Sequence, residues 1–220
     1  MGKRRTYGEA CGIPRALDIV GERWALMIVR ELVLGPKRFT DIRTGLPGVS
    51  PDVLAQRLRE LEESAVIAHR TLPPPAASKV YELTDWGREL ESVLIALGRW
   101  GARAPGAPPE ECMSFDSHLL SLLTLFEPSV AGDFETVLKL ELDGRSFRAE
   151  VAAGRLDIQP GEANDAVATV VGDPRALIDV AHGRRKLDEA VRGGDLTVAG
   201  DKRAVKRFVG LFPMPEPAAA

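Results

Sequence analysis

Cysteine and long apolar runs are scarce in this chain. Its two cysteines, Cys11 and Cys112, lie about 100 positions apart, which is the spacing of neither a disulfide scaffold nor a zinc site. Reduced thiols are therefore expected. No apolar stretch approaches the roughly 20 residues that cross a bilayer, and the basic start MGKRRTYGEACG lacks the apolar segment of a secretory signal. These absences predict a cytoplasmic protein that does not insert into membranes.

Residue groupings that carry catalysis or bind metal are also lacking. The three histidines, His69, His118 and His182, fall in different predicted elements. No carboxylate pair, Ser/His/Asp set, metal-ligand spacing or phosphate-cradling glycine loop accompanies them. We therefore predict a protein that is not an enzyme and needs no cofactor or metal ion, with each histidine on the surface or in a core.

What the chain does contain is enough material for two domains and an uneven charge. It has 220 residues, of which 45% are hydrophobic and 28% charged, as in folded soluble proteins. Residues 1–81 hold 13 Lys and Arg against 9 Asp and Glu, whereas residues 111–220 hold 13 against 18. A basic front and an acidic back predict two different roles.

A segment rich in proline and glycine divides the chain. Residues 101–114, GARAPGAPPEECMS, contain three prolines and two glycines and follow a long helical pattern. We assign residues 1–103 to a first domain, 104–114 to a linker, 115–212 to a second domain and 213–220 to a flexible tail.

Three helices and a hairpin are predicted early in the first domain. Residues 22–35 carry a helical apolar stripe, and residues 38–48 form a short second helix. A third helix begins near Ser50, and residues 66–84 form two strands around a proline-rich loop. This is the order of elements in a winged helix-turn-helix.

The third helix has a cap and two distinct faces. Ser50 can accept from the first-turn N–H groups, and Pro51 suits the first helical position. Gln56 and Arg57 lie away from the buried stripe, which consists of Leu54, Leu58, Leu61 and Ala65. Amide and guanidinium groups read base edges in the major groove. A solvated polar face would look similar, and the order of elements favours DNA binding over that alternative.

Short motifs in a fixed order strengthen this interpretation. They are Cys11, the turn Gly21-Glu22-Arg23-Trp24, Arg38-Phe39, the cap Gly48-Val49-Ser50, Leu54 to Glu62, and Leu83-Thr84 with Gly87. In this order they resemble the HxlR-type winged-helix regulators, relatives of MarR regulators, over residues 11–103. The resemblance implies a homodimer that binds double-stranded operator DNA.

The resemblance also implies roles for particular residues. The helix from Ser50 would be the recognition helix, Lys37 and Arg38 would meet the DNA backbone, and Arg70 and Lys79 would lie at the base of the wing. The expected DNA-binding set is Lys37, Arg38, Ser50, Asp52, Gln56, Arg57, Arg59, Arg70 and Lys79. The wing loop, PPPAAS, carries no charge, so a minor-groove arginine is not expected there.

Dimerisation is assigned to the helical pattern that begins at residue 85. Together with residues 14–20, its apolar stripe would form the dimer interface, and the stripe consists of Trp86, Leu90, Val93, Leu94, Leu97 and Trp100. Two recognition helices would then face successive major grooves about 34 Å apart.

Cys11 has two interpretations. Some HxlR-type regulators sense oxidants or electrophiles through a thiol at this place, and the nearby Arg15 favours the thiolate. A plain reduced cysteine is the alternative.

Beyond the linker, strand patterns come first and helices follow. Residues 134–144, FETVLKLELDG, alternate apolar and charged residues and end in a turn. At least four strands are predicted to form a meander, and the other three lie at residues 146–154, 155–161 and 165–173. A helix opened by Asp173-Pro174, a second helix, a last strand and a helix capped by Asp201 complete the pattern.

The segments LELDG, VAAGRLDIQPG, ATVVGDPRALIDVAHGRRKLDEAVRGGDLTVAGD and FVGLF resemble sterol-carrier-protein-like lipid-binding domains, over residues 116–212. The resemblance implies an antiparallel sheet covered by helices, with an apolar tunnel for a fatty acyl chain or sterol. Candidate wall residues are Leu119, Leu122, Leu123, Phe126, Leu177, Val180, Phe208, Leu211 and Phe212. The run Arg184-Arg185-Lys186 is interpreted as solvated, with binding of a ligand carboxylate or phosphate as the alternative.

The expected fold class is α+β, a winged helix-turn-helix domain followed by a sterol-carrier-like domain. The expected function is that of a dimeric transcriptional regulator responsive to a small apolar ligand. Two alternatives stay open. One is a regulator whose second domain is purely structural and which senses through Cys11. The other is a lipid carrier whose winged helix makes protein contacts.

Overall fold

The computed structural model describes residues 6–73, 78–105 and 113–219. The chain forms two compact units, Met1–Leu94 and Ile95–Ala220, and the division falls inside helix α6 (Leu90–Gly101). The tip of the predicted wing, most of the predicted linker and Cys112 lie outside the described residues.

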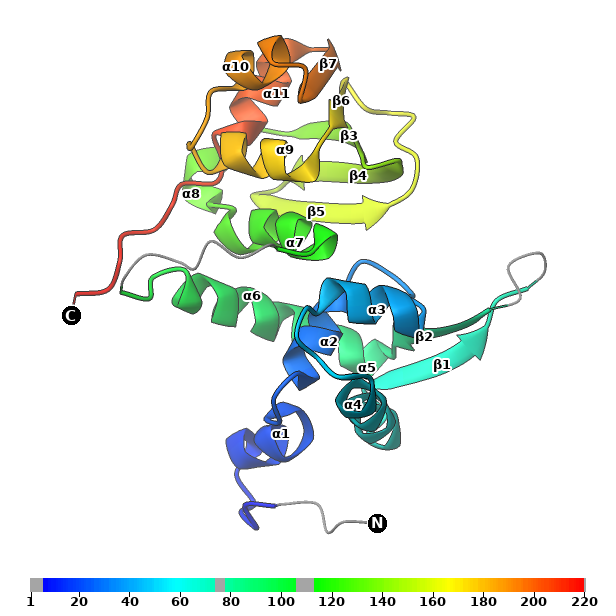
Figure 1. The fold of residues 1–220 in the computed structure, drawn as a ribbon. Coiled ribbons are helices and arrows are strands. Elements are labelled where there is room, and N and C mark those ends of the chain that lie inside the picture. Colours follow the sequence, from blue (N-terminus) through cyan, green and yellow to red (C-terminus); the bar gives the residue numbers. More distant parts are fainter. Residues whose placement is uncertain (1–5, 74–77, 106–112, 220) are drawn as a thin grey trace. The chain divides into compact units, whose positions relative to one another are not determined.

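The first unit has the predicted winged-helix order, which Figure 1 shows in blue to green. The helical pattern predicted from residue 85 is two helices, a short α5 followed by α6. The elements before α6 are α1 (Gly12–Val20), α2 (Ala25–Leu32), α3 (Phe39–Gly45), α4 (Pro51–Glu63), β1 (Ile67–Thr71), β2 (Lys79–Leu83) and α5 (Asp85–Arg88).

Helix α4 begins as its sequence predicts. The Ser50 hydroxyl accepts from the Val53 N–H at 3.3 Å, and Pro51 occupies the first turn, where it has no hydrogen bond to lose. Leu54, Leu58 and Leu61 are buried in a core that also takes residues from α2, α3 and β1. Ala65 does not continue this face, because it lies beyond the helix with a φ of 57°.

The corner after α4 is closely packed against the start of α5. The Thr84 hydroxyl donates to the Ala65 carbonyl at 2.7 Å and accepts from the Gly87 N–H at 3.0 Å. A Cβ at Gly87 would lie 2.0 Å from the Val66 carbonyl oxygen, so only glycine fits. The hairpin is fixed on its other side, where Lys37 and Tyr81 exchange backbone hydrogen bonds of 2.9 and 2.8 Å.

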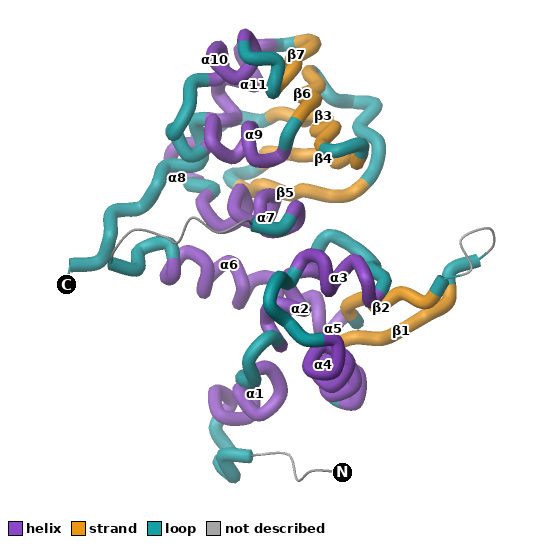
Figure 2. The backbone as a smooth tube through the Cα atoms, viewed as in Figure 1, coloured by secondary structure: helices purple, strands orange, loops and turns teal. Residues whose placement is uncertain are grey.

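The second unit combines a five-stranded sheet with helices, drawn in orange and purple in Figure 2. The strand order is β5-β4-β3-β6-β7. The strands are β3 (Thr136–Leu142), β4 (Arg145–Ala152), β5 (Arg155–Pro160), β6 (Ala168–Gly172) and β7 (Leu196–Gly200), and the helices are α7 (Phe115–Leu125), α8 (Pro128–Ala131), α9 (Pro174–Ala181), α10 (Leu187–Arg192) and α11 (Lys202–Val209).

The predicted meander holds for three strands and is wrong for the fourth. Strands β3, β4 and β5 pair antiparallel in sequence, but β6 returns to pair parallel with β3, so the sheet is mixed. Alternating hydrophobicity reports which face of a strand is buried and not which strand lies beside it, so the pattern could not identify this partner.

The two faces of the sheet differ in character. Leu138, Leu140 and Leu142 are buried on the helix-covered side, where α7, α9 and α11 pack. The alternate positions carry ion pairs, such as Lys139 with Glu141 at 2.6 Å. The start of α7 is fixed by its N-cap, because the Ser114 hydroxyl accepts from the Ser117 N–H at 3.1 Å.

Candidate functional site

The outward face of α4 carries the predicted donors, but acidic neighbours hold two of them. Gln56 is exposed, and its amide donates to the Glu60 carboxylate at 3.0 Å. The Arg57 side chain is only 15% exposed and pairs with Glu60 and, at 3.6 Å, with Glu22 in the turn before α2. Arg59 is exposed and forms no ion pair within the described part of the chain. The cation most accessible on this helix is therefore Arg59 and not Arg57.

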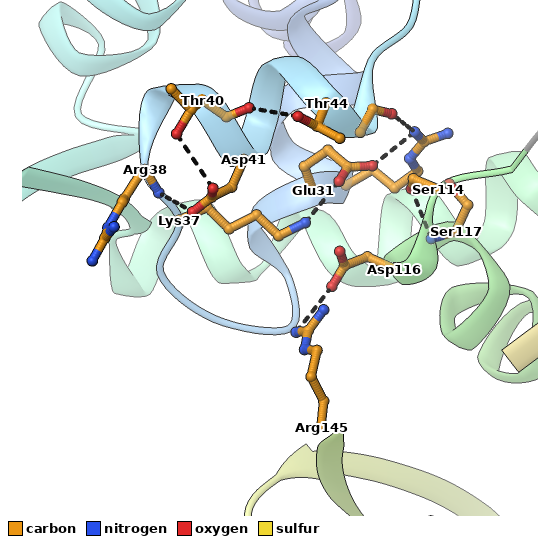
Figure 3. A network of polar contacts seen from close by, with 12 residues as sticks. Glu31, Lys37, Arg38, Thr40, Asp41, Thr44, Ser114, Asp116, Ser117 and Arg145 are labelled. Carbon is orange, nitrogen blue, oxygen red and sulfur yellow. Dashed lines mark hydrogen bonds and ion pairs between the residues drawn. The ribbon is translucent and has the colours of Figure 1, made fainter. Parts of the chain in front are cut away.

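The two residues expected at the DNA backbone, Lys37 and Arg38, differ sharply. The Lys37 side chain is 12% exposed, and its ammonium donates to the fully buried Glu31 at 2.7 Å (Figure 3). Arg30 donates to the other oxygen of the same carboxylate at 2.8 Å. Arg38 is exposed, and its backbone N–H donates to Asp41 at 3.2 Å at the start of α3. Lys37 therefore helps to neutralise a buried carboxylate, and Arg38 remains accessible.

The wing supplies two more cations. Arg70 on β1 pairs with Glu82 on β2 at 2.8 Å, and its side chain remains 47% exposed. Lys79 is exposed and has no ion pair among the residues described here. Residues 74–77, and with them most of the uncharged loop, lie outside the described residues.

Sequence reasoning did not propose Arg23 or Arg43 as DNA contacts. Arg43 is exposed in the last turn of α3, the helix before α4. Arg23 is exposed, and its guanidinium lies 5.3 Å from the centre of the Trp24 ring. The order of the two helices in a helix-turn-helix motif could have indicated Arg43, because the first helix of such motifs crosses the DNA backbone.

Apolar side chains are exposed on α1, α5 and α6. Ile13 on α1 and Trp100 on α6 are 72% and 76% exposed, and Leu17, Trp86, Val93 and Leu97 are also exposed. The predicted dimer stripe is divided, because Leu90 and Leu94 pack against the core of the first unit. Cys11 lies exposed just before α1 as a free thiol. Burial of such side chains against a partner would remove apolar surface from water.

The nine residues predicted to line a ligand cavity in the second unit are all buried. Seven of them pack into the core, while Val180 and Phe212 also border a cleft of about 530 Å³. The cleft lies between the carboxyl ends of α9 and α11, the α9–α10 connection and residues 212–214. Its rim carries Lys186 and Lys206.

Two histidines of the second unit remain neutral at physiological pH. Burial, and then the nearby Arg184 charge, lower the pKa of His182 to about 4. Burial likewise lowers the pKa of His118 on α7. Neither ring nitrogen of His182 has a hydrogen-bond partner within the described ranges. An uncharged ring is what such surroundings favour, since an unpaired buried charge would be far more costly.

Over the described residues, no cluster of three or more His, Cys, Asp or Glu side chains could hold a metal ion. The same residues include no helix with the length and apolar character required to cross a membrane.

Comparison with known proteins matches each half of the chain to a protein family. A family described as HxlR-like helix-turn-helix matches residues 19–107. The HTH-type transcriptional regulator YvaP of Bacillus subtilis (strain 168) is 37% identical over 86 residues, which are 39% of this chain and 80% of YvaP. The chain belongs to the HxlR-like helix-turn-helix family. Residues 129–213 match the SCP-2 sterol transfer family, so the HxlR-like domain is followed by an SCP-2 domain.

Other relatives of the HxlR-like domain are also transcriptional regulators. YodB of B. subtilis (strain 168) is 35% identical over 85 residues, covering 39% of this chain and 76% of YodB. The solved structure of reduced YodB is 32% identical and covers 45% of this chain and 100% of that chain, with a TM-score of 0.40. The family match and the sequence relatives, and not this superposition, identify the HxlR-like domain as a helix-turn-helix domain of transcriptional regulators.

Proposed function

We propose that the protein is a homodimeric transcriptional regulator that binds double-stranded operator DNA through α4 and responds to a small molecule bound by its SCP-2 domain. The observation that supports DNA binding most directly is the orientation of α4. Its leucines are buried in the core, and Gln56 and Arg59 lie exposed on the opposite side. Operator binding would place its action in the cytoplasm.

Around α4, exposed cations supply phosphate contacts. Four exposed cations surround the helix-turn-helix. They are Arg38 just before α3, Arg43 on α3, Arg59 on α4 and Lys79 at the base of the wing. Contacts of this kind orient a protein on the duplex, and base edges are read by the first turns of the recognition helix. Gln56 and Arg57 would take that second role once DNA competes with Glu60 for them.

Dimerisation is the role proposed for the exposed apolar side chains of α1 and α6. Burying Ile13, Leu17 and Val93 against a second copy would remove a large apolar area from water, which favours association. Two α4 helices would then meet one duplex at half-sites about one helical turn apart.

Effector response would operate through linkage. A ligand that binds one dimer geometry more tightly than the other shifts the population toward that geometry, and DNA affinity changes by the same coupling factor. A ligand with equal affinity for both geometries would change nothing.

The DNA-binding proposal is tested by fluorescence anisotropy with a labelled fragment of the gene's own promoter, at several salt concentrations. Arg59→Ala should weaken binding and lower the slope of log affinity against log salt by about 2, because a dimer loses two phosphate contacts. Arg155→Ala, which removes an exposed cation on β5, is the matched control and should leave both unchanged.

Absence of any preference for the promoter fragment at physiological salt would refute the DNA proposal. That result would favour the lipid carrier whose winged helix makes protein contacts.

A second candidate function is thiol sensing by Cys11. The thiol is exposed before α1, where the dimer surface is proposed. YodB, a relative of the HxlR-like domain, has been solved in reduced and quinone-bound forms. If Cys11 senses electrophiles, benzoquinone should change promoter binding of the wild type and not of Cys11→Ser; an equal change in both proteins would exclude it.

A further inference from the structure

The cleft at the carboxyl ends of α9 and α11 joins apolar walls to a charged rim. Its apolar side consists of Val180, Leu187, Val209, Phe212 and Met214. Phe212 is buried and forms part of the wall, whereas Met214 is largely exposed. The volume of about 530 Å³ falls within the range of small-molecule sites.

Two ammonium groups on the rim form no ion pair with any described residue. Lys186 and Lys206 are exposed, and neither forms an ion pair in the part of the chain that the structure describes. Arg185 also lines the cleft, but its guanidinium pairs with Asp195 at 2.6 Å and donates to the Glu189 carbonyl at 3.2 Å. Lysine ammonium groups without partners are suited to a negatively charged ligand atom.

The remaining polar groups indicate the charge of that ligand. Asp188 is the acidic residue of the lining, and it offsets one of the two lysines. His182 contributes no charge at neutral pH, since burial lowers its pKa to about 4. With the Arg185–Asp195 pair compensated, the residues that line the cleft carry a surplus of one positive charge. One surplus charge matches a monoanion better than a phosphate dianion.

The apolar walls indicate the rest of the ligand. A thioether such as that of Met214 makes favourable contacts with aromatic rings, and its flexible chain adapts to their edges. The Phe212 side chain offers a second apolar surface. A compact apolar group can lie between them while its anionic end reaches the rim.

We propose that this cleft binds a small amphipathic monocarboxylate with a compact, aromatic-like apolar end. The proposal rests on the proposed function and deepens it, because it gives the chemical class of the effector. Lys186 and Lys206 hold the carboxylate, and Val209, Phe212 and Met214 cover the apolar end. The sequence left open that the run Arg184-Arg185-Lys186 binds a ligand carboxylate or phosphate. In this proposal Lys186 is the residue of that run that binds the carboxylate.

The test uses the full chain and isothermal titration calorimetry with 4-phenylbutanoate as the probe. Saturable binding with one site per chain is expected. The neutral analogue 4-phenylbutan-1-ol should bind at least about tenfold more weakly, because a hydrogen bond to a charged group contributes more than one between neutral groups. Equal affinity for acid and alcohol, or no saturable binding of the acid, would overturn the proposal.

Variants locate the site. The double substitution Lys186→Gln, Lys206→Gln should weaken 4-phenylbutanoate at least about tenfold, and Met214→Gln should weaken it about threefold. Lys202→Gln removes an exposed lysine of α11 that does not line the cleft and should leave affinity unchanged. An equal loss in Lys202→Gln, or no loss in the double variant, would refute the assignment. All four positions are exposed, so folding is expected to be retained, and circular dichroism checks this.

Promoter binding measured on the same preparations separates the two levels of the proposal. Binding of 4-phenylbutanoate that depends on the two lysines supports the cleft, even if promoter affinity does not respond, and in that case only the coupling between cleft and DNA is refuted. Promoter binding by a chain that ignores 4-phenylbutanoate refutes the cleft and leaves the DNA proposal intact.

Discussion

Replacing Glu60 by glutamine should increase the affinity of the protein for its operator. In the free protein the Glu60 carboxylate holds both Arg57 and Gln56, the two side chains proposed to read bases. Any contact of Arg57 with DNA must therefore compete with this ion pair. Glutamine keeps the size of the side chain and removes its charge, so the ion pair left to Arg57 among the described residues is the one with Glu22 at 3.6 Å.

The size of the effect follows from the exposure of the pair. The side chains of Arg57 and Glu60 are 15% and 29% exposed, and pairs near the surface contribute about 0.2–1 kcal/mol. A dimer contains two copies, so the affinity should rise by roughly 0.4–2 kcal/mol, which is about 2- to 30-fold. The free energy of unfolding should fall by less than about 1 kcal/mol, and the variant should remain folded.

Fluorescence anisotropy with the promoter fragment measures this change, and Glu63→Gln is the matched control. Glu63 is exposed on the same helix and holds neither Arg57 nor Gln56, so its replacement removes an equal charge without releasing either donor. Glu60→Gln should exceed this control in affinity. Equal gains would show that Arg57 is not restrained by its pair, and a loss of affinity would show that Glu60 orients Arg57 for binding.

Three further predictions concern stability, assembly and pH. Leu58→Ala, at a buried position of α4, should lower the free energy of unfolding by about 2–5 kcal/mol in urea denaturation, and a change below 1 kcal/mol would contradict the packing. Val93→Glu should convert the dimer into a monomer in sedimentation velocity, because it places a charge on the exposed apolar side of α6, whereas a dimer that persists would exclude this surface. His182 should titrate near pH 4 in NMR spectra. Because its pKa is lowered in the folded state, its contribution to stability is present above its unfolded pKa of about 6.5 and is lost as the pH falls toward 4, and His182→Phe should remove this part of the pH dependence.

Features coded by neighbouring residues were predictable from the sequence. Helix α4 begins at Pro51 after the Ser50 cap because cap, proline and leucine spacing all act within a few positions of one another. The same holds for the alternating strand β3 and for the Asp201 cap of α11, whose carboxylate accepts from the Arg203 and Ala204 N–H groups. In the first domain, the order of the predicted helices and strands over residues 22–84 was sufficient to predict the winged helix-turn-helix.

Features that join distant segments were not predictable in the same way. Glu31 and Lys37 lie on either side of the predicted end of a helix, and neither the burial of Glu31 nor its pairing follows from periodicity. Glu22 reaches Arg57 only because the turn before α2 packs near α4. The cleft is formed by two segments of the second unit that are separated in the sequence, residues 180–188 and 206–214, so its charge balance became visible only once they were brought together.

The Thr84–Gly87 corner limits how the first unit can move. Since the Thr84 hydroxyl bridges the residues just after α4 to the first turn of α5, and since no space separates Gly87 from the Val66 carbonyl, α5 cannot slide without displacing the end of α4. If α4 binds DNA and α1 and α6 form the dimer surface, as proposed above, a one-residue insertion in this corner would rotate α4 relative to that surface and misalign two half-sites, even in a protein that folds normally.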